Sequence, residues 1–230
     1  MIPFPSSPHL DRLIDLALEE DIGPGDVTTQ ALIPPDLQGE AHIRAKETLV
    51  VAGLPVAERV FRRLDPLIDF EAEAADGQEV GAGAALGRIT GPVAAILTGE
   101  RTALNFLMRL SGIATFTRKM AARVAGYPVF LTDTRKTTPG WRVLEKYAVR
   151  LGGGRNHRLG LYDGVLIKNN HLAASESITA AIKEARENTP HTLKIEVEVT
   201  DLAGLKEALA AGADIIMLDN MAEAAMTEAV

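Results

Sequence analysis

Apolar and polar positions change their spacing along this chain near residue 112. After Ser7 and Pro8, which suit the N-cap and the first position of a helix, apolar residues recur at helical spacing. Short alternating runs separated by glycines then predict strands between Gly39 and Thr90, and the segment VAERVFRRL predicts a helix among them. The first part of the chain, residues 1–112, is therefore expected to form a mixed α+β domain.

Turn and helix-stop signals mark the connections of this first domain. The segment EDIGPGDVTTQALIP is rich in glycine, proline and threonine and predicts a turn-rich connection. Pro92 is expected to open a helix that runs to about Leu110 and stops at Gly112. The domain boundary is therefore placed at this glycine.

Beyond residue 112, apolar runs that predict strands alternate with segments that predict helices. Thr138 and Pro139 suit the cap and the first position of the first of these helices, and Gly152 suits a left-handed stop after it. Alternation at spacings of about 20 to 35 residues predicts a parallel sheet or barrel. The expected strands are Val129–Thr132, Val165–Ile167, Ile195–Val199 and Ile215–Leu218, and the expected helices are Pro139–Val149, Ser177–Asn188 and Leu202–Ala211.

Charged residues lie at the end of each expected strand. Arg135 and Lys136 follow the first strand, Lys168 ends the second, Glu198 lies near the end of the third, and Asp219 ends the fourth. In βα barrels the active site lies at the C-terminal ends of the strands. Any single charge at a strand end has an ordinary interpretation as a surface residue, but four consecutive ones favour an active site.

The composition narrows the classes of protein to which the chain can belong. Its 31 acidic residues outnumber 24 basic ones and aromatic residues make up only 4%, which argues against nucleic-acid binding. The lack of cysteine excludes disulfides and thiolate metal sites. No apolar run approaches the roughly 18 residues of a membrane helix and the N-terminus lacks a secretory signal, so no membrane partner and a cytoplasmic location are expected. Against a net charge of −7, the basic residues gathered between Asp133 and His171 indicate a local anion site.

The expected barrel is shorter than a closed one. A closed eight-unit barrel needs roughly 200 to 250 residues, whereas the residues after position 112 suffice for about four or five strand–helix units. The sequence also ends within an expected helix, MAEAAMTEAV. Either the sheet is open or the second domain is incomplete at its C-terminus, and the end within a helix favours an incomplete domain.

Several segments, taken together and in order, resemble the quinolinate phosphoribosyltransferase family, also called nicotinate-nucleotide pyrophosphorylase (carboxylating). They are EDIGPGDVTTQALIP, ERTALNFLMRLSGIAT, DTRKTTPGWRVLEKYAVRLGGGRNHRLGLYDGVLIKNNH, IEVEV and GADIIMLDNM. The resemblance implies an α/β fold, with an N-terminal α/β sandwich domain (residues 1–112) followed by an open α/β barrel domain (residues 113–230). It also implies a homodimer in which one subunit's barrel and the partner's N-terminal domain share each active site.

The resemblance also implies a reaction of NAD biosynthesis and assigns residues to it. The family joins quinolinate to phosphoribosyl pyrophosphate with Mg²⁺ and yields nicotinate mononucleotide, pyrophosphate and carbon dioxide. Guanidinium groups suit the two carboxylates of quinolinate because they bind carboxylates through paired hydrogen bonds. By resemblance, the substrate-binding residues are Arg101 from the neighbouring subunit, Arg135, Lys136, His157, Arg158, Lys168, Glu198 and Asp219. By the same match, the catalytic residues are Lys136, Lys168, Glu198 and Asp219, and the two acidic residues serve Mg²⁺, through water or pyrophosphate.

Some residues in these motifs keep a second interpretation or depart from the family pattern. Arg101 on its own reads as a solvated helix residue, and Arg109 and Arg142 keep that interpretation. Met108 stands where a glutamine is common, with no mechanism attached to it. Asn169 replaces the usual aspartate beside a lysine, which removes one negative charge from its surroundings.

The residues around the second and third expected strands leave choices open. Glu196 and Glu198 alternate in one strand and therefore point to the same face, so spacing cannot choose between them, and only the resemblance favours Glu198. His171 is expected to cap a loop or to support Lys168. The glycines Gly152–Gly154 lack a complete phosphate-loop fingerprint and are interpreted as a turn.

Other functions remain as alternatives. One is the molybdenum-associated paralogue of the same fold, which typically departs from the TRKTTPG pattern that this chain carries. Another is a non-catalytic, truncated family member, because the glycine-rich segments that bind the sugar 5′-phosphate in the family do not follow in this sequence. A generic phosphatase or aldolase barrel is the third, and the aldolase predicts a Schiff base on Lys168.

Overall fold

The computed structural model describes residues 2–5 and 7–230, and the chain divides into two compact units. The first unit ends at His157, and the second comprises Arg158–Val230. Among the described residues, no helix combines the length and the apolar character that crossing a membrane requires.

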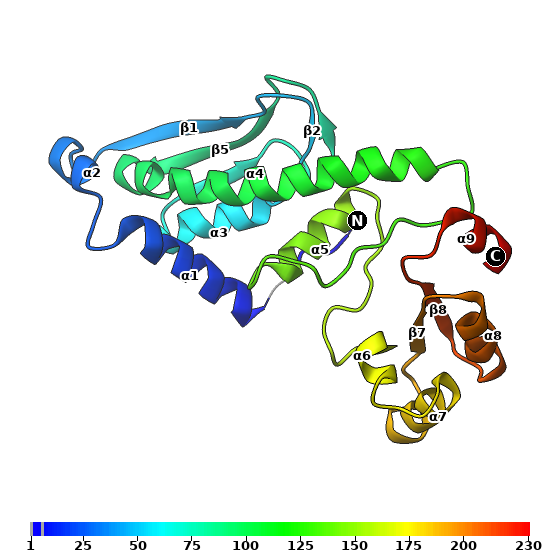
Figure 1. Ribbon diagram of the computed structural model, residues 1–230. Helices are drawn as coiled ribbons and strands as arrows, with labels where there is room; N and C mark the ends of the chain where they lie inside the picture. The colour runs from blue at the N-terminus through cyan, green and yellow to red at the C-terminus, as the bar shows by residue number, and fades with distance from the viewer. Residues whose placement is uncertain (1, 6) are drawn as a thin grey trace. The chain divides into compact units, whose positions relative to one another are not determined.

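The first unit combines helices with antiparallel strands (Figure 1). Strand β5 lies between β1 and β3, and the register places Ala41 of β1 and Phe70 of β3 on either side of Ile89. Strands β2 and β4 form a separate antiparallel pair. The elements are α1 (Pro8–Ile22), α2 (Val27–Leu32), β1 (Gln38–Arg44), β2 (Leu49–Val50), α3 (Leu54–Leu64), β3 (Asp69–Ala72), β4 (Glu79–Val80), β5 (Ala85–Pro92), α4 (Val93–Val124) and α5 (Arg142–Leu151).

Helix α4 is the central packing element of the first unit. It contacts α3, α5 and the strands β1, β2 and β5, and Figure 1 shows it running alongside the sheet. Gly99 permits the close approach of α3, because a Cβ at this position would lie 2.8 Å from Leu64 Cδ1. Phe106 and Leu110 of the same helix are fully buried in the core.

Two N-terminal helices show how local sequence signals act. Ser7 caps α1 and its hydroxyl accepts a hydrogen bond from the Leu10 amide, as predicted. The segment expected to be a turn-rich connection instead contains helix α2. Asp26 caps this helix by accepting a 2.9 Å hydrogen bond from the Thr29 amide.

The prediction that a helix stops at Gly112 is wrong. Helix α4 runs through this glycine to Val124, because its buried face continues with Ala114 and Thr117. A single glycine weakens a helix interior by about 1 kcal/mol relative to alanine, which continued packing outweighs. The expected domain boundary therefore falls inside a continuous helix, and the division of domains at residue 112 stays a prediction.

The region after α4 departs further from expectation. The expected strand Val129–Thr132 is reduced to an isolated parallel bridge between Thr132 and Arg155, and its apolar side chains are largely exposed. The next helix begins at Arg142 rather than at Pro139, with Trp141 as its N-cap, because residues 138–141 form a turn closed by the Trp141 amide on the Thr138 carbonyl. Gly153, with φ of 96°, takes the left-handed position that was expected for Gly152.

The second unit contains a parallel sheet in the order β6–β7–β8. All three strands have the predicted bounds, and Val197 of β7 lies opposite Ile167 of β6 and Ile216 of β8. Helices α7 and α8 contact each other and β7, and Ile182 and Ala208 from these helices are buried against the sheet. The elements are β6 (Val165–Ile167), α6 (Asn169–Leu172), α7 (Ile178–Asn188), β7 (Ile195–Val199), α8 (Leu202–Ala210), β8 (Ile215–Leu218) and α9 (Glu223–Ala229).

The two faces of β7 carry different side chains. Ile195, Val197 and Val199 belong to the apolar core that includes the helices. Because side chains alternate along a strand, Glu196 and Glu198 point to the opposite face, where both are also buried. The sequence pattern IEVEV therefore builds an apolar face for packing and an acidic face for chemistry.

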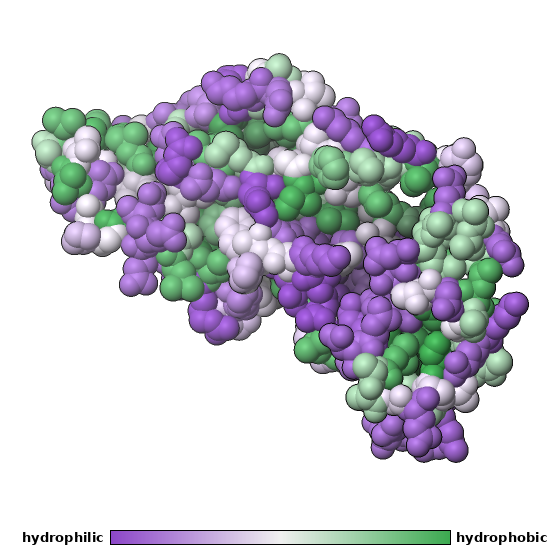
Figure 2. Space-filling view, viewed as in Figure 1, coloured by the Kyte–Doolittle hydropathy of each residue, from purple (hydrophilic) through white to green (hydrophobic). Residues whose placement is uncertain are grey.

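Apolar side chains also reach the surface of the first unit. Figure 2 shows hydrophobic atoms gathered over α2, where Val27 is 76% exposed and Leu32 is 72% exposed. Exposed apolar patches of this kind are typical of surfaces that bind a partner.

Candidate active site

The predicted site residues divide between the two units. Arg101, Arg135, Lys136 and His157 belong to the first unit, and Arg158, Lys168, Glu198 and Asp219 belong to the second.

In the first unit, Arg135 and Lys136 lie in the irregular segment between the Thr132 bridge and α5. Arg135 is half-buried and Lys136 is exposed. The Arg135 Nε is a buried donor without a hydrogen-bond partner among the described residues. A buried donor left unpaired is unfavourable by about 1–3 kcal/mol, so this guanidinium is suited to an anionic ligand.

The Asp133 carboxylate connects this segment to His157. Its Oδ1 accepts a 2.9 Å hydrogen bond from the His157 amide and also pairs with the ammonium of Lys146 on α5. The Lys146 Nζ also donates to the His157 carbonyl at 3.0 Å. The first unit thus brings the segments of Arg135 and His157 together through an ion pair.

A second cluster holds the loop that follows Lys136. The Arg109 guanidinium donates to Glu145 Oε1 at 2.7 Å and to the Thr138 hydroxyl at 2.7 Å. Glu145 Oε2 accepts from the Thr138 amide at 3.2 Å. Burial raises the pKa of Glu145, but the hydrogen bonds from Arg109 and Thr138 outweigh burial and hold that pKa below its usual value. Arg109 is therefore not the merely solvated residue that was expected, and Arg142 also bonds the loop, through the Thr137 hydroxyl at 3.1 Å.

Arg101 lies on α4 and its side chain is exposed. An exposed side chain fits both the expected role toward a neighbouring subunit and the interpretation as a solvated helix residue, so the role of Arg101 stays a prediction.

In the second unit, Lys168 and Glu198 form an ion pair at the ends of neighbouring strands. Lys168 Nζ lies 2.8 Å from Glu198 Oε1, and the side chains are 45% and 11% exposed. His171 supports Lys168 as one interpretation predicted, because its Nδ1 accepts a 2.9 Å hydrogen bond from the Lys168 amide. The parallel register of β6 and β7 is what brings the two charges to one edge.

Asp219 and Arg158 complete the second group. Asp219 directly follows β8, and its amide donates to the Val199 carbonyl at 2.8 Å, so it lies at the same edge as the end of β7. Asn220 after it adopts a left-handed conformation with φ of 54°, which turns the chain sharply. Arg158 donates to the Gly164 carbonyl at 2.8 Å, while its buried Nε has no hydrogen-bond partner in the described part of the chain.

The carboxylates at this edge could hold a divalent cation that also takes water and phosphate ligands. Within the described residues, no group of three or more His, Asp or Glu side chains is arranged to hold a metal ion. Glu198 and Asp219 instead offer two carboxylates at one sheet edge. Mg²⁺ is usually bound by one or two carboxylates together with water and substrate phosphates, so this pair suits it.

Sequence reasoning missed the residues that support the site. Asp133, Glu145 and Lys146 were quoted within the long motif but given no role. The available signal was charge on a buried face, because Glu145 and Lys146 stand between the apolar residues Leu144 and Tyr147 of α5. Buried charges are rare unless paired, so such a position predicts a partner.

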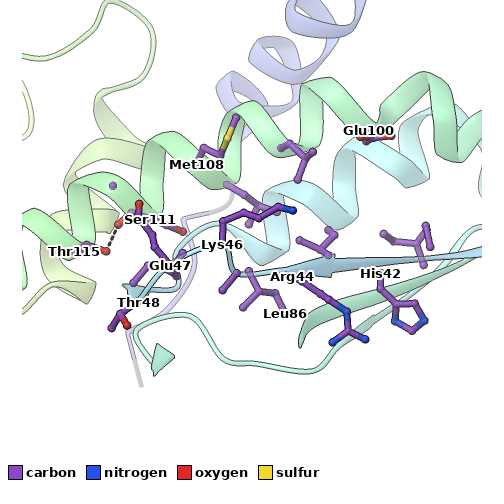
Figure 3. Close-up of a pocket in the computed structure, with 18 of the residues that line it drawn as sticks. His42, Arg44, Lys46, Glu47, Thr48, Leu86, Glu100, Met108, Ser111 and Thr115 are labelled. Atoms are coloured by element: carbon purple, nitrogen blue, oxygen red, sulfur yellow. Dashed lines mark hydrogen bonds between the residues drawn. The ribbon is translucent and has the colours of Figure 1, made fainter. Parts of the chain in front are cut away.

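A separate cavity of about 870 Å³ lies in the first unit between α4 and the β1 region (Figure 3). Figure 3 shows Lys46 extending into the space below α4, and Met108 and Glu100 belong to that helix. None of the predicted site residues lines this cavity. It is therefore a feature of the α4 surface and distinct from both groups of site residues.

The fold carries an ammonium and two carboxylates at the ends of neighbouring parallel strands, and arginines whose buried Nε donors lack a partner among the described residues. Such an α/β fold suits an enzyme that acts on small anions. The family models for the N-terminal and C-terminal domains of quinolinate phosphoribosyl transferase match residues 26–111 and 113–230. The chain belongs to this family, as the motifs predicted.

Named relatives and solved structures agree with this family membership. The chain is 51% identical over 223 residues to a probable nicotinate-nucleotide pyrophosphorylase [carboxylating] of Synechocystis, covering 96% of this chain and 75% of the relative. It is 46% identical to the Bacillus subtilis protein of the same name, covering 92% and 73%. A NadC structure from Streptococcus pyogenes has a TM-score of 0.92 at 42% identity, covering 99% of this chain and 81% of that one. These structures confirm the predicted α/β fold class, a sandwich domain followed by an open barrel.

Proposed function

We propose that the protein transfers the phosphoribosyl group of phosphoribosyl pyrophosphate to quinolinate and releases pyrophosphate, carbon dioxide and nicotinate mononucleotide. The relatives that carry this enzyme's name match nearly the whole chain, which favours this function over the paralogue, the non-catalytic member and the generic barrels. The observation that supports the substrate is made within each unit: Arg135 in the first and Arg158 in the second each have a buried Nε donor that lacks a partner among the described residues. Each of these guanidinium groups suits one carboxylate.

The side chains have distinct roles in the proposed reaction. Arg135, His157 and Arg158 bind and orient quinolinate, Lys136 completes this pocket, and Lys168 lies between quinolinate and the ribosyl donor. Contacts from these side chains to the two carboxylates hold the pyridine ring so that its nitrogen faces the anomeric carbon.

Bond changes then follow at the sugar. The bond between the anomeric carbon and the pyrophosphate oxygen breaks, and the oxygen keeps the electron pair. Glu198 and Asp219 stabilise the positive charge that develops on the ribose. The pyridine nitrogen supplies the electron pair for the new bond. The resulting pyridinium accepts the electrons of the adjacent carbon–carboxylate bond, carbon dioxide leaves, and a proton takes its place on the ring.

Glu198 and Asp219 are also the proposed Mg²⁺ ligands, directly or through water. When bound, Mg²⁺ neutralises negative charge on pyrophosphate. The donor set supports this assignment, because both groups supply the oxygen atoms that Mg²⁺ prefers.

The homodimer expected from the family is also part of the proposal. Leu97, Met108 and Phe116 of α4 are 43%, 56% and 65% exposed and line the 870 Å³ cavity. An exposed apolar row on the helix that carries Arg101 supports a subunit contact there. The cytoplasmic location remains a prediction from composition.

Product analysis tests the function directly. Purified protein is incubated with quinolinate, phosphoribosyl pyrophosphate and Mg²⁺, and products are separated by chromatography while carbon dioxide is trapped from carboxyl-labelled quinolinate. The expected result is nicotinate mononucleotide and carbon dioxide in equal amounts, with neither formed when phosphoribosyl pyrophosphate is omitted. Carbon dioxide release without the donor, or no nucleotide with both substrates, would contradict the proposal.

A further inference from the structure

A buried ion pair joins two segments of the first unit that carry proposed quinolinate-binding residues. The side chain of Lys146 is 2% exposed and that of Asp133 is 9% exposed. The Lys146 ammonium contacts Asp133 Oδ1 and the His157 carbonyl, and Asp133 Oδ1 also accepts from the His157 amide. The pair therefore holds both the donor and the acceptor of the His157 backbone.

Backbone hydrogen bonds join the segment that contains Asp133 to the segment that contains His157, but these bonds end at Arg155. The Arg155 amide donates to the Leu131 carbonyl at 2.8 Å, and the Asp133 amide donates to the Arg155 carbonyl at 3.1 Å. Beyond this short parallel ladder, the side chains of Asp133 and Lys146 continue the connection. With its amide oriented to satisfy both neighbours, Asn156 adds donors to Asp133 Oδ2 at 2.9 Å and to the Lys146 carbonyl at 3.0 Å.

Helix α5, which carries Lys146, is itself firmly anchored. Gly152 at its end packs against α4 so closely that a Cβ there would lie 2.5 Å from the Ala114 carbonyl oxygen. The Tyr147 hydroxyl donates to Asp76 Oδ2 at 3.0 Å, and Asp76 accepts from the amides of Gly53 and Leu54. Burial, together with Asp76, raises the pKa of Tyr147, which keeps the hydroxyl a donor. Lys146 thus projects from a fixed platform.

A gain in folding stability does not by itself explain why the protein has a buried ion pair at this position. Replacing a buried ion pair with apolar residues of similar volume is often neutral or stabilising. An ammonium and a carboxylate provide what apolar groups do not, namely directional bonds that fix two backbone segments at once. Arg135 lies two residues after Asp133, so the same bonds fix the approach of its side chain.

We propose that the Asp133–Lys146 pair is a positioning device for quinolinate, which holds Arg135 and His157 in register without touching the substrate. This inference rests on the proposed function. It assigns a role to two residues that lie outside the predicted substrate-binding set.

The test compares Lys146→Met, Asp133→Asn and the double variant with wild type, and Lys183→Met, on the exposed surface of α7, is the matched control. Quinolinate affinity is measured by calorimetry, KM for each substrate by steady-state kinetics, and stability by thermal unfolding. Lys146→Met is expected to weaken quinolinate binding and raise its KM at least about tenfold, while KM for phosphoribosyl pyrophosphate changes less than about threefold. Lys183→Met is expected to match wild type.

The double variant distinguishes a positioning role from the destabilising effect of one buried, unpaired charge. Lys146→Met leaves the Asp133 carboxylate buried and unpaired, which is strongly destabilising, and Asp133→Asn in the same chain removes that charge. Thermal stability is therefore expected to recover in the double variant, whereas quinolinate affinity is expected to stay low because the bond to the His157 carbonyl is still missing. Should Lys146→Met fail to fold, the double variant and Asp133→Asn carry the same comparison.

The outcomes distinguish this inference from the proposed function. Wild-type protein that neither binds nor converts quinolinate overturns both. Active wild type together with folded variants that keep wild-type quinolinate affinity overturns the positioning role alone. Recovery of affinity in parallel with stability in the double variant also overturns it, because charge burial then explains the whole effect.

Discussion

The acidic face of β7 offers two glutamates two residues apart, and replacing each by glutamine shows which one serves catalysis. Glu196 and Glu198 point to the same face and are 6% and 8% exposed. The Glu198 Oε1 accepts a 2.8 Å hydrogen bond from the Lys168 Nζ. Glutamine keeps the shape and one acceptor oxygen, so Glu198→Gln removes the charge with little change in packing.

The structural part of the effect is expected to be small. Lys168 is 45% exposed, so solvent screens its attraction to Glu198. Ion pairs between exposed groups contribute about 0.2–1 kcal/mol, and the near-neutral replacement retains part of the hydrogen bond. The free energy of unfolding should therefore fall by less than about 1 kcal/mol.

The effect of Glu198→Gln on catalysis is expected to be larger than its effect on folding stability. Removing one group that stabilises developing charge in a transition state typically lowers kcat by about 10²–10³-fold, which corresponds to about 2.7–4 kcal/mol. If Glu198 faces the cationic ribose, its replacement should affect kcat well beyond its effect on folding. Glu196→Gln changes the same charge on the same strand and should lower kcat by less than about tenfold.

The assay measures kcat at saturating substrates and Mg²⁺ and the free energy of unfolding in urea for both variants. The reasoning is refuted if Glu196→Gln loses as much activity as Glu198→Gln. It is also refuted if Glu198→Gln loses activity only in proportion to its loss of folded protein.

Three further predictions concern charge and pH. Arg109→Met should lower the free energy of unfolding by about 1 kcal/mol at pH 7, a modest loss because Arg109 is half-exposed. Because the pKa of Glu145 is lowered in the folded protein, the stability that Glu145 contributes is present above the usual pKa of 4.5 and is lost as pH falls through the folded value. Urea titrations should therefore show that the stability difference between wild type and Arg109→Met shrinks in acid. Burial raises the pKa of Asp76 above 3.8, so wild-type stability should decline as pH rises through the raised value, and thermal unfolding of Asp76→Asn should lack this decline. Removing divalent cations with EDTA should abolish turnover but leave the unfolding temperature unchanged, and a large drop in that temperature would indicate a structural metal instead.

The parallel strands were the most predictable elements. Strand β7 reads IEVEV, and its apolar residues alternate with glutamates, so its period of two is a signal that the local sequence reveals. The run Val129–Thr132 is also rich in residues that favour strands, yet its Phe130 side chain is 62% exposed and the segment makes a single bridge, to Arg155. Strand formation depends on a neighbour that can pair, and no local pattern reports whether that neighbour exists.

The predictions of helix boundaries were wrong where contacts elsewhere in the fold decided the boundary. Gly112 carries a stop signal, but α4 continues because residues on both sides of the glycine pack into one core. Thr138 carries a capping signal, but its hydroxyl and amide bond to Glu145 instead of capping the helix. Core packing in the first case, and the hydrogen bonds between Thr138 and Glu145 in the second, outweighed a preference of about 1 kcal/mol.

The strand ends that carry Lys168, Glu198 and Asp219 were predictable from the sequence, whereas the ion pairs that support the neighbouring segments were not. The ends of β6, β7 and β8 lie at one edge, and Lys168 pairs with Glu198 there, as the strand-end pattern suggested. The Asp133–Lys146 pair spans 13 residues and depends on how α5 packs, which the sequence does not state. Buried charge on an otherwise apolar helix face was the usable signal for it.

The most direct test of the central claim compares the binding of quinolinate, with two carboxylates, and nicotinate, with one, by calorimetry. Wild-type protein is expected to bind quinolinate at least about tenfold more tightly, because each guanidinium–carboxylate pair adds charge-assisted hydrogen bonds. Arg135→Ala and Arg158→Ala should each remove most of this preference. Equal affinity for both ligands, or quinolinate binding that is unchanged in both variants, would contradict the assignment of these arginines to a dicarboxylate.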